Sequence, residues 1–248
     1  MGAFRTLPLG RRRIQSRVLV LYRLRPERLA ALLPAGFTPR VQADFAIGAA
    51  LYTRLEPVLP NPRAQGSEHL AYRFAVQRAD GQAAGWVARR ETSSWFEARC
   101  SKLLRGAHGR ARFRCAESSL TLELTVEGEQ GEELYLRGES APAPGQALFT
   151  HPSELEHFLA AEREVRPQDV FAPEADQLQL DKCFAPEPLT LFEARSRFLS
   201  HAPFASGEVE LDSAWRLVTR RLDPAPARRA AFQAPPGRAG TAPALPTS

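Results

Sequence analysis

The sequence predicts a chain of the mainly β (α+β) class, in which an antiparallel, barrel-like sheet carries a few short helices. Three observations support this class. Runs of β-branched and aromatic residues outnumber helical segments, turn-forming residues separate these runs, and the helical segments are short. No internal repeat or linker divides the chain before its last segment, so we expect one domain over residues 10–222.

The first half of the chain contains four of the expected strands. Residues 17–24 form a nearly continuous apolar run, which is typical of a strand buried on both faces. Residues 45–55 are again strand-like. Residues 69–78 and 84–92 flank Asp80-Gly81, and an Asp-Gly turn between two apolar runs predicts a β-hairpin.

The second half contains four more. Apolar and polar residues alternate over 120–126, which predicts a strand with one face in water. A turn at 128–131 leads into residues 134–139 and predicts a second hairpin. Residues 189–195 and 208–222 are the last two strand-like segments.

Short helices are expected at three places. Pro26 suits the first position of a helix, and leucines follow at helical spacing until Pro34. Ser153 and Glu156 have the spacing of a capping box, which predicts a helix after them. Residues 196–200 could form a third helical piece.

Composition excludes several classes of protein. Of the 248 residues, 44 % are hydrophobic and 25 % are charged, a balance typical of a chain with a folded core. The net charge is +5, but Lys102 and Lys182 are the only lysines and the arginines are spread among 28 acidic residues, so we expect no nucleic-acid partner. The Pro-, Ala- and Arg-rich residues 223–248 cannot bury enough apolar surface to fold, and we expect a disordered tail.

Targeting and redox signals are weak throughout. No apolar run approaches the ~20 residues that span a bilayer, and the N-terminus has no signal-peptide pattern, so we expect no membrane partner and no secretion. The three cysteines are too few and too scattered for a disulfide framework. A reducing cytoplasmic location fits them best.

Motifs of the common cofactor and metal sites are missing. There is no Gly-rich phosphate loop, no Gly-x-Ser-x-Gly elbow, no His-Glu-x-x-His and no paired Cys-x-x-Cys. His151 and His157 are six residues apart and would lie on different faces of a helix. We therefore expect neither a cofactor nor a metal.

The first candidate site lies around Glu68, which enters an expected core strand next to His69. If Glu68 faces inward, desolvation favours its neutral form, and a carboxyl in that state can act as an acid or base near neutral pH. In the alternative interpretation, Glu68 pairs with an arginine at the entrance of the strand. The residues alone leave both interpretations open.

The second candidate site follows the next strand, where charged residues and hydroxyls precede a turn that we expect to bury two aromatics. Arg90 could hold a carboxylate with two hydrogen bonds, and Ser93 or Ser94 could donate to an oxyanion. In the alternative interpretation, Arg and Glu side chains pair across strands and a serine caps the turn. The sequence is compatible with either interpretation.

The order of motifs resembles a known superfamily. Residues 20–34 read Val-Leu-Tyr-Arg-Leu-Arg-Pro-Glu-Arg-Leu-Ala-Ala-Leu-Leu-Pro, which resembles the Tyr-Arg-x-Asp-Pro-x-x-Leu-x-x-x-(Leu/Val)-(Leu/Val)-Pro opening of the acetoacetate decarboxylase superfamily. Ser67-Glu68 and Arg90-Glu91-Thr92-Ser93-Ser94 follow in the same order and look closest to the DUF2071 (YqjF-like) branch. The resemblance covers roughly residues 15–222. It implies a cone-like antiparallel β-barrel whose interior holds a small carboxylate or carbonyl ligand.

One defining residue of true acetoacetate decarboxylases is missing. Their lysine forms a Schiff base with the substrate ketone. Counting from Arg90-Glu91, the same positions hold Glu97 and Ala98, with Phe96 in place of the family's proline. Lys102 would need a four-residue shift of the alignment. A carboxylate cannot form an imine, so the resemblance does not imply acetoacetate decarboxylation.

The resemblance also suggests which residues line the cavity. The family's glutamate on the earlier strand corresponds to Glu68. Its substrate-contacting arginine falls on Gln15, with Arg13 and Arg17 on either side. The expected pocket residues are Arg17, Phe74, Trp86, Glu91, Trp95 and Glu97.

Three functional hypotheses are compatible with these residues. In the first, the barrel is an enzyme for dehydration, aldol cleavage or cyclisation of a small keto or hydroxy acid, with Glu68 as acid or base, Arg90 as carboxylate anchor, and Ser93 or Ser94 as oxyanion donor. In the second, the same barrel binds an apolar or aromatic acid without reacting it. In the third, a filled barrel serves only as a structural or interaction protein. A homo-oligomer is the expected assembly.

Overall fold

A computed structural model of the chain describes residues 12–57, 66–103, 108–142, 145–160, 163–165, 184–201, 204 and 207–219. The predicted disordered tail at 223–248 and both ends of the predicted domain lie outside these residues. They therefore stay predictions. Within the described part, no helix is long and apolar enough to cross a membrane.

One sheet joins all of the described strands. Its main path runs β11-β6-β5-β4-β1-β13-β12-β10-β9-β8, and neighbours pair antiparallel except that β11 lies parallel to β6. The long strands are β1 (Arg12–Leu24), β4 (Phe45–Pro57), β5 (Ser67–Arg78), β6 (Ala83–Thr92), β8 (Arg112–Glu117), β9 (Thr121–Gly128), β10 (Gly131–Ser140), β12 (Phe184–Ser196) and β13 (Val209–Thr219). The short strands are β2 (Phe37–Pro39), β3 (Val41–Gln42), β7 (His108–Arg110) and β11 (Arg163–Val165).

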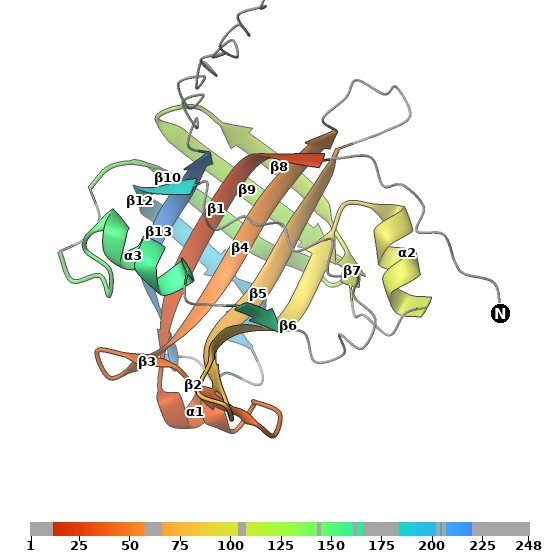
Figure 1. Cartoon of the computed structure of the whole chain (residues 1–248). Helices are drawn as coiled ribbons and strands as arrows, with labels where there is room; N and C mark the ends of the chain where they lie inside the picture. The colour runs from red at the N-terminus through yellow and green to blue at the C-terminus, as the bar shows by residue number, and fades with distance from the viewer. Residues whose placement is uncertain are drawn as a thin grey trace, which may run out of the picture.

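The segment 108–117 brings the sheet close to a barrel. Its first part, β7, pairs in parallel with β6, and its second part, β8, pairs with β9. Between them the backbone N–H of Ala111 donates to the carbonyl of Thr92 at 3.0 Å. One continuous stretch thus links the β6 side of the sheet to the β9 side, and Figure 1 shows the strands curving around a common interior.

Four short helices accompany the sheet in the described part of the chain: α1 (Pro26–Ala30), α2 (Trp95–Leu103), α3 (Pro152–Ala160) and α4 (Arg197–Ser200). Figure 1 shows α3 on the outside of the sheet, α1 at one end of it, and α2 beside β6 and β7. Phe198 of α4 packs on Tyr72 with ring centroids 4.6 Å apart, and Phe204, after the end of α4, packs on Phe74 at 5.7 Å. This corner therefore fills part of the interior with aromatic rings.

The side-chain alternation of β1 explains its unbroken apolar run. Val18, Val20 and Tyr22 point into the barrel core, whereas Leu19 and Leu21 belong to a second core on the outer face. That outer core includes Leu155 and Phe158 of α3, so both faces of the strand are buried. Burying a side chain of this size stabilises the fold by about 1.5–3 kcal/mol.

The predicted fold class is confirmed: the chain is mainly β, its sheet is nearly closed, and its helices are few and short. Both predicted hairpins are present, as β5–β6 and β9–β10. The predicted strand 120–126 also has one solvent-exposed face, since its side chains alternate between exposed and buried.

The predicted capping box at Ser153 and Glu156 is wrong. Helix α3 begins at Pro152, two residues before the start that this box implies, and the fixed φ of Pro152 suits the first helical position. Its start is capped by Glu154, whose carboxylate accepts the backbone N–H groups of Thr150 at 3.1 Å and His151 at 3.3 Å. Ser153 therefore lies inside the helix.

Candidate functional site

The strand alternation divides the predicted site residues between the two faces of the sheet. Leu70, Tyr72 and Phe74 of β5 point into the barrel core, and Glu68 shares their face. Arg17 lies on the opposite, outer face, beside Leu19. The sequence-predicted site is therefore not one cluster.

A bulge in β6 decides which of its residues face inward. Phe74 pairs with Trp86, but Tyr72 pairs with Arg89, so one extra residue stands between these pairs. Such a bulge moves the side chain of every following residue to the opposite face of the sheet. Arg89 and Glu91 consequently point into the barrel, and Arg90 points out. The bulge thus places Arg90 on the face opposite to Glu68, and its role as a carboxylate anchor stays a prediction.

Glu68 lies at one end of the interior, where two residues donate three hydrogen bonds to one of its carboxylate oxygens. The Tyr52 hydroxyl donates to Glu68 Oε1 at 2.7 Å, and Arg54 Nη2 donates to the same atom at 3.0 Å. No donor among the described residues contacts Oε2. The Glu68 side chain is 21 % exposed, so this second oxygen lies in a region that solvent reaches.

Further polar groups continue this cluster across neighbouring strands. Ser16 pairs in register with Arg54 and donates to Glu117 Oε2 at 2.7 Å. Arg216 forms an ion pair with Glu117 Oε1 at 3.0 Å. We call this set the rim cluster. It comprises Ser16, Tyr52, Arg54, Glu68, Cys115, Glu117 and Arg216.

Burial keeps two acidic groups of the rim cluster protonated. It raises the pKa of the Tyr52 phenol, and the neighbouring Cys115 and Glu68 add to this effect. It also raises the pKa of the Cys115 thiol. Tyr52 is therefore a permanent hydrogen-bond donor, and Cys115 is not a thiolate nucleophile near neutral pH.

A second polar cluster lies deeper and is more fully buried. Arg89 reaches Glu91 Oε1 at 2.7 Å and Glu133 Oε1 at 2.9 Å. The Tyr72 hydroxyl donates to the carbonyl of Glu133 at 3.0 Å and accepts from Ser196 at 3.1 Å. We call these five residues the buried cluster.

The two carboxyl groups of the buried cluster are removed from water. Glu91 is 2 % exposed and Glu133 is 0 % exposed. Burial raises the pKa of Glu91, and the Glu133 charge adds to this, while the hydrogen bond and charge of Arg89 oppose it. The burial effect is the larger one.

Besides Oε2 of Glu133, two donor groups of the interior have no partner in the described part of the chain. They are the Tyr22 hydroxyl and the indole Nε1 of Trp86. Tyr22, Gly48, Phe74 and Trp86 stand in one register row across four strands. The predicted pocket residues Phe74 and Trp86 thus do lie inside the barrel, with their rings stacked 5.9 Å apart.

The two candidate oxyanion serines have structural contacts. The Ser93 hydroxyl accepts the backbone N–H of Glu68 at 2.8 Å, and this bond fixes the start of β5. The Ser94 hydroxyl accepts the N–H of Glu97 at 3.3 Å, which makes Ser94 the N-cap of α2. The capping alternative therefore describes Ser94 better than the oxyanion role.

The two aromatic residues that were expected to be buried after β6 are exposed. Trp95 is 53 % exposed and Phe96 is 47 % exposed, because both lie in the first turn of a helix on the outside of the sheet. Arg99 stacks over the Trp95 ring at 5.2 Å. Glu97 contacts the Thr92 hydroxyl at 3.2 Å on the outer face. Trp95 and Glu97 are thus not interior pocket residues.

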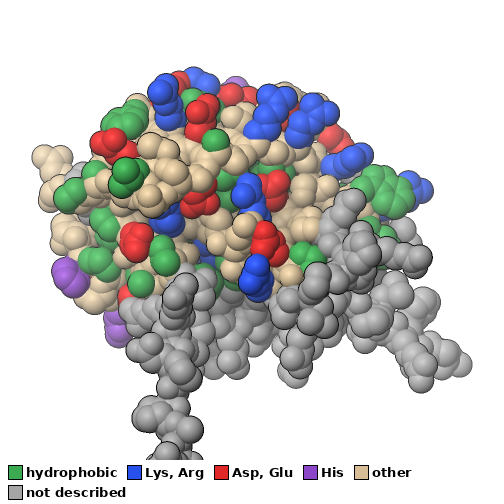
Figure 2. Space-filling model, turned by 90° about the horizontal axis from the view of Figure 1, so that it is seen from above, with side chains coloured by type: hydrophobic (Ala, Val, Ile, Leu, Met, Phe, Trp, Pro, Cys, Tyr) green, Lys and Arg blue, Asp and Glu red, His purple; other side chains and the backbone are tan. Residues whose placement is uncertain are grey.

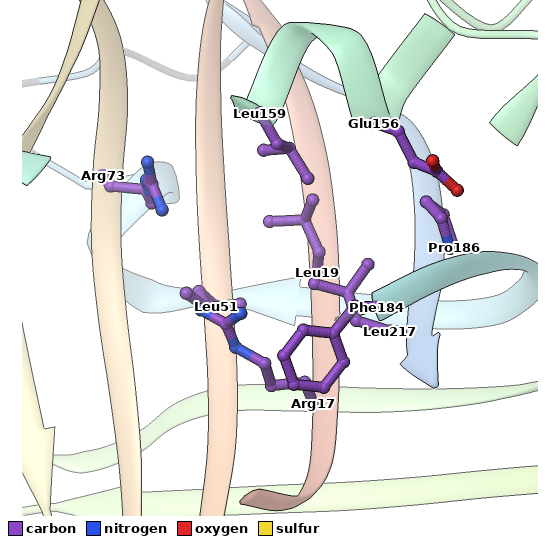
Figure 3. Close-up of a pocket in the computed structure, with 9 residues that line it drawn as sticks. All are labelled: Arg17, Leu19, Leu51, Arg73, Glu156, Leu159, Phe184, Pro186 and Leu217. Carbon is purple, nitrogen blue, oxygen red and sulfur yellow. The ribbon is translucent and has the colours of Figure 1, made fainter. Parts of the chain in front are cut away.

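An outer pocket lies between α3 and the sheet (Figure 3). Arg17 stacks over the Phe184 ring at 5.3 Å, and Arg73 lies nearby where Gly85 leaves it room. The pocket has a volume of about 20 Å³, enough for one water molecule. The pocket is lined by Arg17, Leu19, Leu51, Arg73, Glu156, Leu159, Phe184, Pro186 and Leu217.

No group of His, Cys, Asp and Glu side chains in the described residues could hold a metal ion. The Lys102 side chain lies outside the described residues. Figure 2 shows basic and acidic side chains next to one another over the described surface seen from above.

Of the twelve residues in the two clusters, only Glu68 and Glu91 were expected as site residues, and the other ten were missed. Tyr52, Arg54 and Arg89 sit within predicted strands, and strict alternation from the apolar core would have found the first two. The bulge conceals Arg89, and Glu133 comes from a strand 44 residues away. No pattern within one segment points to such a contact.

No protein-family model matches the sequence, and no curated protein matches it. Among solved structures it is similar to the enduracididine biosynthesis enzyme MppR complexed with pyruvate, at 12 % identity and a TM-score of 0.49, over 82 % of this chain and 83 % of that chain. It is also similar to an acetoacetate decarboxylase-like enzyme from Sphingomonas wittichii RW1, at 12 % identity and a TM-score of 0.47, over 82 % and 88 % of the two chains. A third similar structure is acetoacetate decarboxylase from Legionella pneumophila, at 10 % identity and a TM-score of 0.47, over 89 % and 90 %. Likeness at this level carries no functional argument, and the chemistry of the site depends on this chain's own residues.

Proposed function

We propose that this chain is a small-molecule barrel enzyme that carries out acid–base chemistry of the lyase, dehydratase or cyclase type on a small keto or hydroxy acid. The observation that carries the proposal is the geometry of Glu68. Tyr52 and Arg54 hold its Oε1, and no donor of the described chain contacts its Oε2. A carboxylate fixed by one oxygen and open at the other is placed to exchange a proton with a substrate.

The rim cluster also offers a substitute for Arg90 as carboxylate anchor. Arg54 uses Nε and Nη2 on Glu68, which leaves its Nη1 hydrogens for a ligand. A guanidinium next to the base also stabilises negative charge that develops on a substrate oxygen. We therefore assign Arg54 as the residue that binds the substrate carboxylate or stabilises the enolate oxygen.

The proton transfer balances without a cofactor. Glu68 Oε2 takes a proton from the carbon next to the keto group, and the C–H electron pair forms the carbon–carbon double bond of an enolate. The carbonyl π electrons move to oxygen, where Arg54 stabilises the charge. Delivery of the proton to another carbon of the enolate, or to its other face, completes isomerisation. In dehydration the proton leaves with a β-hydroxyl as water, while the enolate oxygen re-forms the carbonyl and a double bond remains between the α and β carbons.

We also propose that the chain belongs to the DUF2071 branch of the acetoacetate decarboxylase superfamily. The support is the order of motifs in the sequence together with the inward position of Glu68. In this proposal the partner is a small molecule, and the reaction needs no Schiff base.

Exchange of the pyruvate methyl hydrogens in deuterium oxide tests the proton transfer, with the loss of the methyl signal followed by NMR. We expect the full chain to accelerate exchange over buffer, and Glu68→Gln to slow it by about 10²- to 10⁴-fold. Glu56→Gln is the matched control, because Glu56 lies on β4 and also pairs with an arginine, Arg13, at 3.1 Å. It should keep the wild-type rate.

Two results would reject this assignment: exchange no faster than in buffer, or an unchanged rate in Glu68→Gln. Saturable pyruvate binding without exchange would favour the alternative, a non-catalytic ligand-binding protein. Borohydride treatment with pyruvate, read by intact mass, separates the acid–base route from an imine. An adduct on Lys102 would restore Schiff-base chemistry.

A further inference from the structure

The buried cluster contains more negative than positive charge. Among the described residues, Glu91 and Glu133 share ion pairs with a single guanidinium, that of Arg89. Both carboxyl groups are almost completely removed from water, where an unbalanced charge is costly. The interior therefore requires one more positive group or one more proton at this place.

One atom marks where such a group would bind. Oε2 of Glu133 is buried and has no hydrogen-bond partner in the described part of the chain, whereas Oε1 of the same carboxyl is held by Arg89. Leaving a buried acceptor unsatisfied costs about 1–3 kcal/mol, and more for a charged group. A hydrogen-bond donor at Oε2 would remove this cost.

The fold makes room for both carboxyl groups. A Cβ on Gly109 of β7 would collide with Glu91 Oε2, and a Cβ on Gly128 of β9 would lie 2.8 Å from Glu133 Cγ. Any other residue at these positions would push the acids out of place. The burial of two carboxyl groups is thus supported by two separate strands.

The buried cluster lies within reach of the rim cluster. Glu91 pairs with Leu70, and Glu68 lies two residues before Leu70 on the same face of β5. Such diagonal neighbours on adjacent strands are about 7–8 Å apart. Arg89 is 31 % exposed, so the buried cluster is not sealed from solvent.

From these observations we infer that the buried cluster binds a cationic N–H group of the ligand, a primary ammonium or an amidinium, with Glu133 Oε2 as its acceptor. This inference rests on the proposed function only in placing the ligand inside the barrel. It narrows the substrate to a keto or hydroxy acid that carries a positively charged nitrogen a few bonds from its carbonyl group.

Three four-carbon probes separate charge from size: n-butylammonium, n-butanol and n-butyrate, each titrated into the full chain by calorimetry at constant ionic strength. We expect butylammonium to bind at least about tenfold more tightly than either of the others, with millimolar affinity for a ligand of this size. Glu133→Gln and Glu91→Gln should each weaken it about tenfold or more. Glu132→Gln is the matched control, because Glu132 is the neighbouring residue but is exposed and pairs with Arg195.

Equal binding of the three probes would overturn the inference, as would unchanged butylammonium binding in both Glu91→Gln and Glu133→Gln. Circular dichroism of each variant verifies that it is folded, and having two variants keeps the test decisive if one does not fold. Butylammonium has no carbonyl group and cannot exchange by enolisation. A failure here is therefore distinct from a failure of the pyruvate exchange at Glu68.

Discussion

Three interior tyrosines differ in what their hydroxyl groups contact. The Tyr52 hydroxyl donates to the Glu68 carboxylate. The Tyr72 hydroxyl donates to the carbonyl of Glu133 and accepts a hydrogen bond from Ser196. Tyr22 has no hydrogen-bond partner in the described chain, although burial and the nearby Tyr72 raise its pKa and keep it protonated. A buried donor without a partner weakens the fold unless a ligand or water satisfies it.

This contrast predicts opposite effects of the same substitution. Tyr22→Phe should leave the free energy of unfolding unchanged or raise it by up to about 1 kcal/mol, since it removes an unsatisfied group. Tyr72→Phe should lower it by about 1–3 kcal/mol, since it leaves Ser196 and the Glu133 carbonyl without their partner. Urea unfolding of the ligand-free chain measures both. An equal loss in the two variants would contradict the assignment of Tyr22 as unsatisfied.

At the scale of elements, β6 and β7 act together to place the buried carboxyl groups. The bulge in β6 turns Arg89 and Glu91 inward, and β7 lies parallel beside them with Gly109 opposite Glu91. Glycine is required there because the Glu91 carboxyl occupies the position of a side chain. A strand of three residues thus determines where a charged group can lie.

Gly109→Ala should therefore destabilise the chain by about 1–3 kcal/mol, the usual range for overpacking. Most of this loss should disappear when Glu91 is also changed to Ala, and a double-mutant cycle measures the coupling. Gly145→Ala is the control, because a Cβ there meets nothing within 4 Å. If Gly109→Ala loses the same amount with and without Glu91, the close contact is not the cause.

At the scale of the whole molecule, the sequence predicts local structure better than the interior. Apolar runs and Asp-Gly or Gly-rich turns located the main strands and both hairpins, because these signals lie within one or two segments. The segment 108–117, which nearly closes the barrel, was not predicted, because charged residues interrupt it and its partners lie on two different strands. Closure of the barrel therefore had to be seen in the structure.

The candidate site shows the same limit. Glu68, Phe74, Trp86 and Glu91 were expected to line the cavity, and all four side chains belong to the inner face. Arg90 was expected there too, but a single inserted residue in β6 reversed its direction. The contacts between Glu133 and Arg89 join β10 to β6 across the interior, and no alternation pattern encodes them.

The net charge of the interior should also appear in the pH dependence of folding. Burial raises the pKa of Glu91 above its value in the unfolded chain, so the folded state binds this proton more tightly. The contribution of Glu91 to stability is therefore most favourable in acid and is lost as pH rises from the ordinary glutamate pKa through the raised one. The groups that face it are Arg89, which opposes the shift, and Glu133 and Glu129, which add to it.

Glu91→Gln removes this titration while keeping a similar shape. The free energy of unfolding of Glu91→Gln, relative to wild type, should rise as pH increases above the ordinary glutamate pKa, and urea unfolding at a series of pH values measures the difference. Glu132→Gln, at an exposed ion pair, should show a much smaller change over the same range. A constant difference between Glu91→Gln and wild type would mean that Glu91 titrates normally. Saturating butylammonium should reduce the slope, because a bound cation supplies the positive charge that the proton otherwise provides.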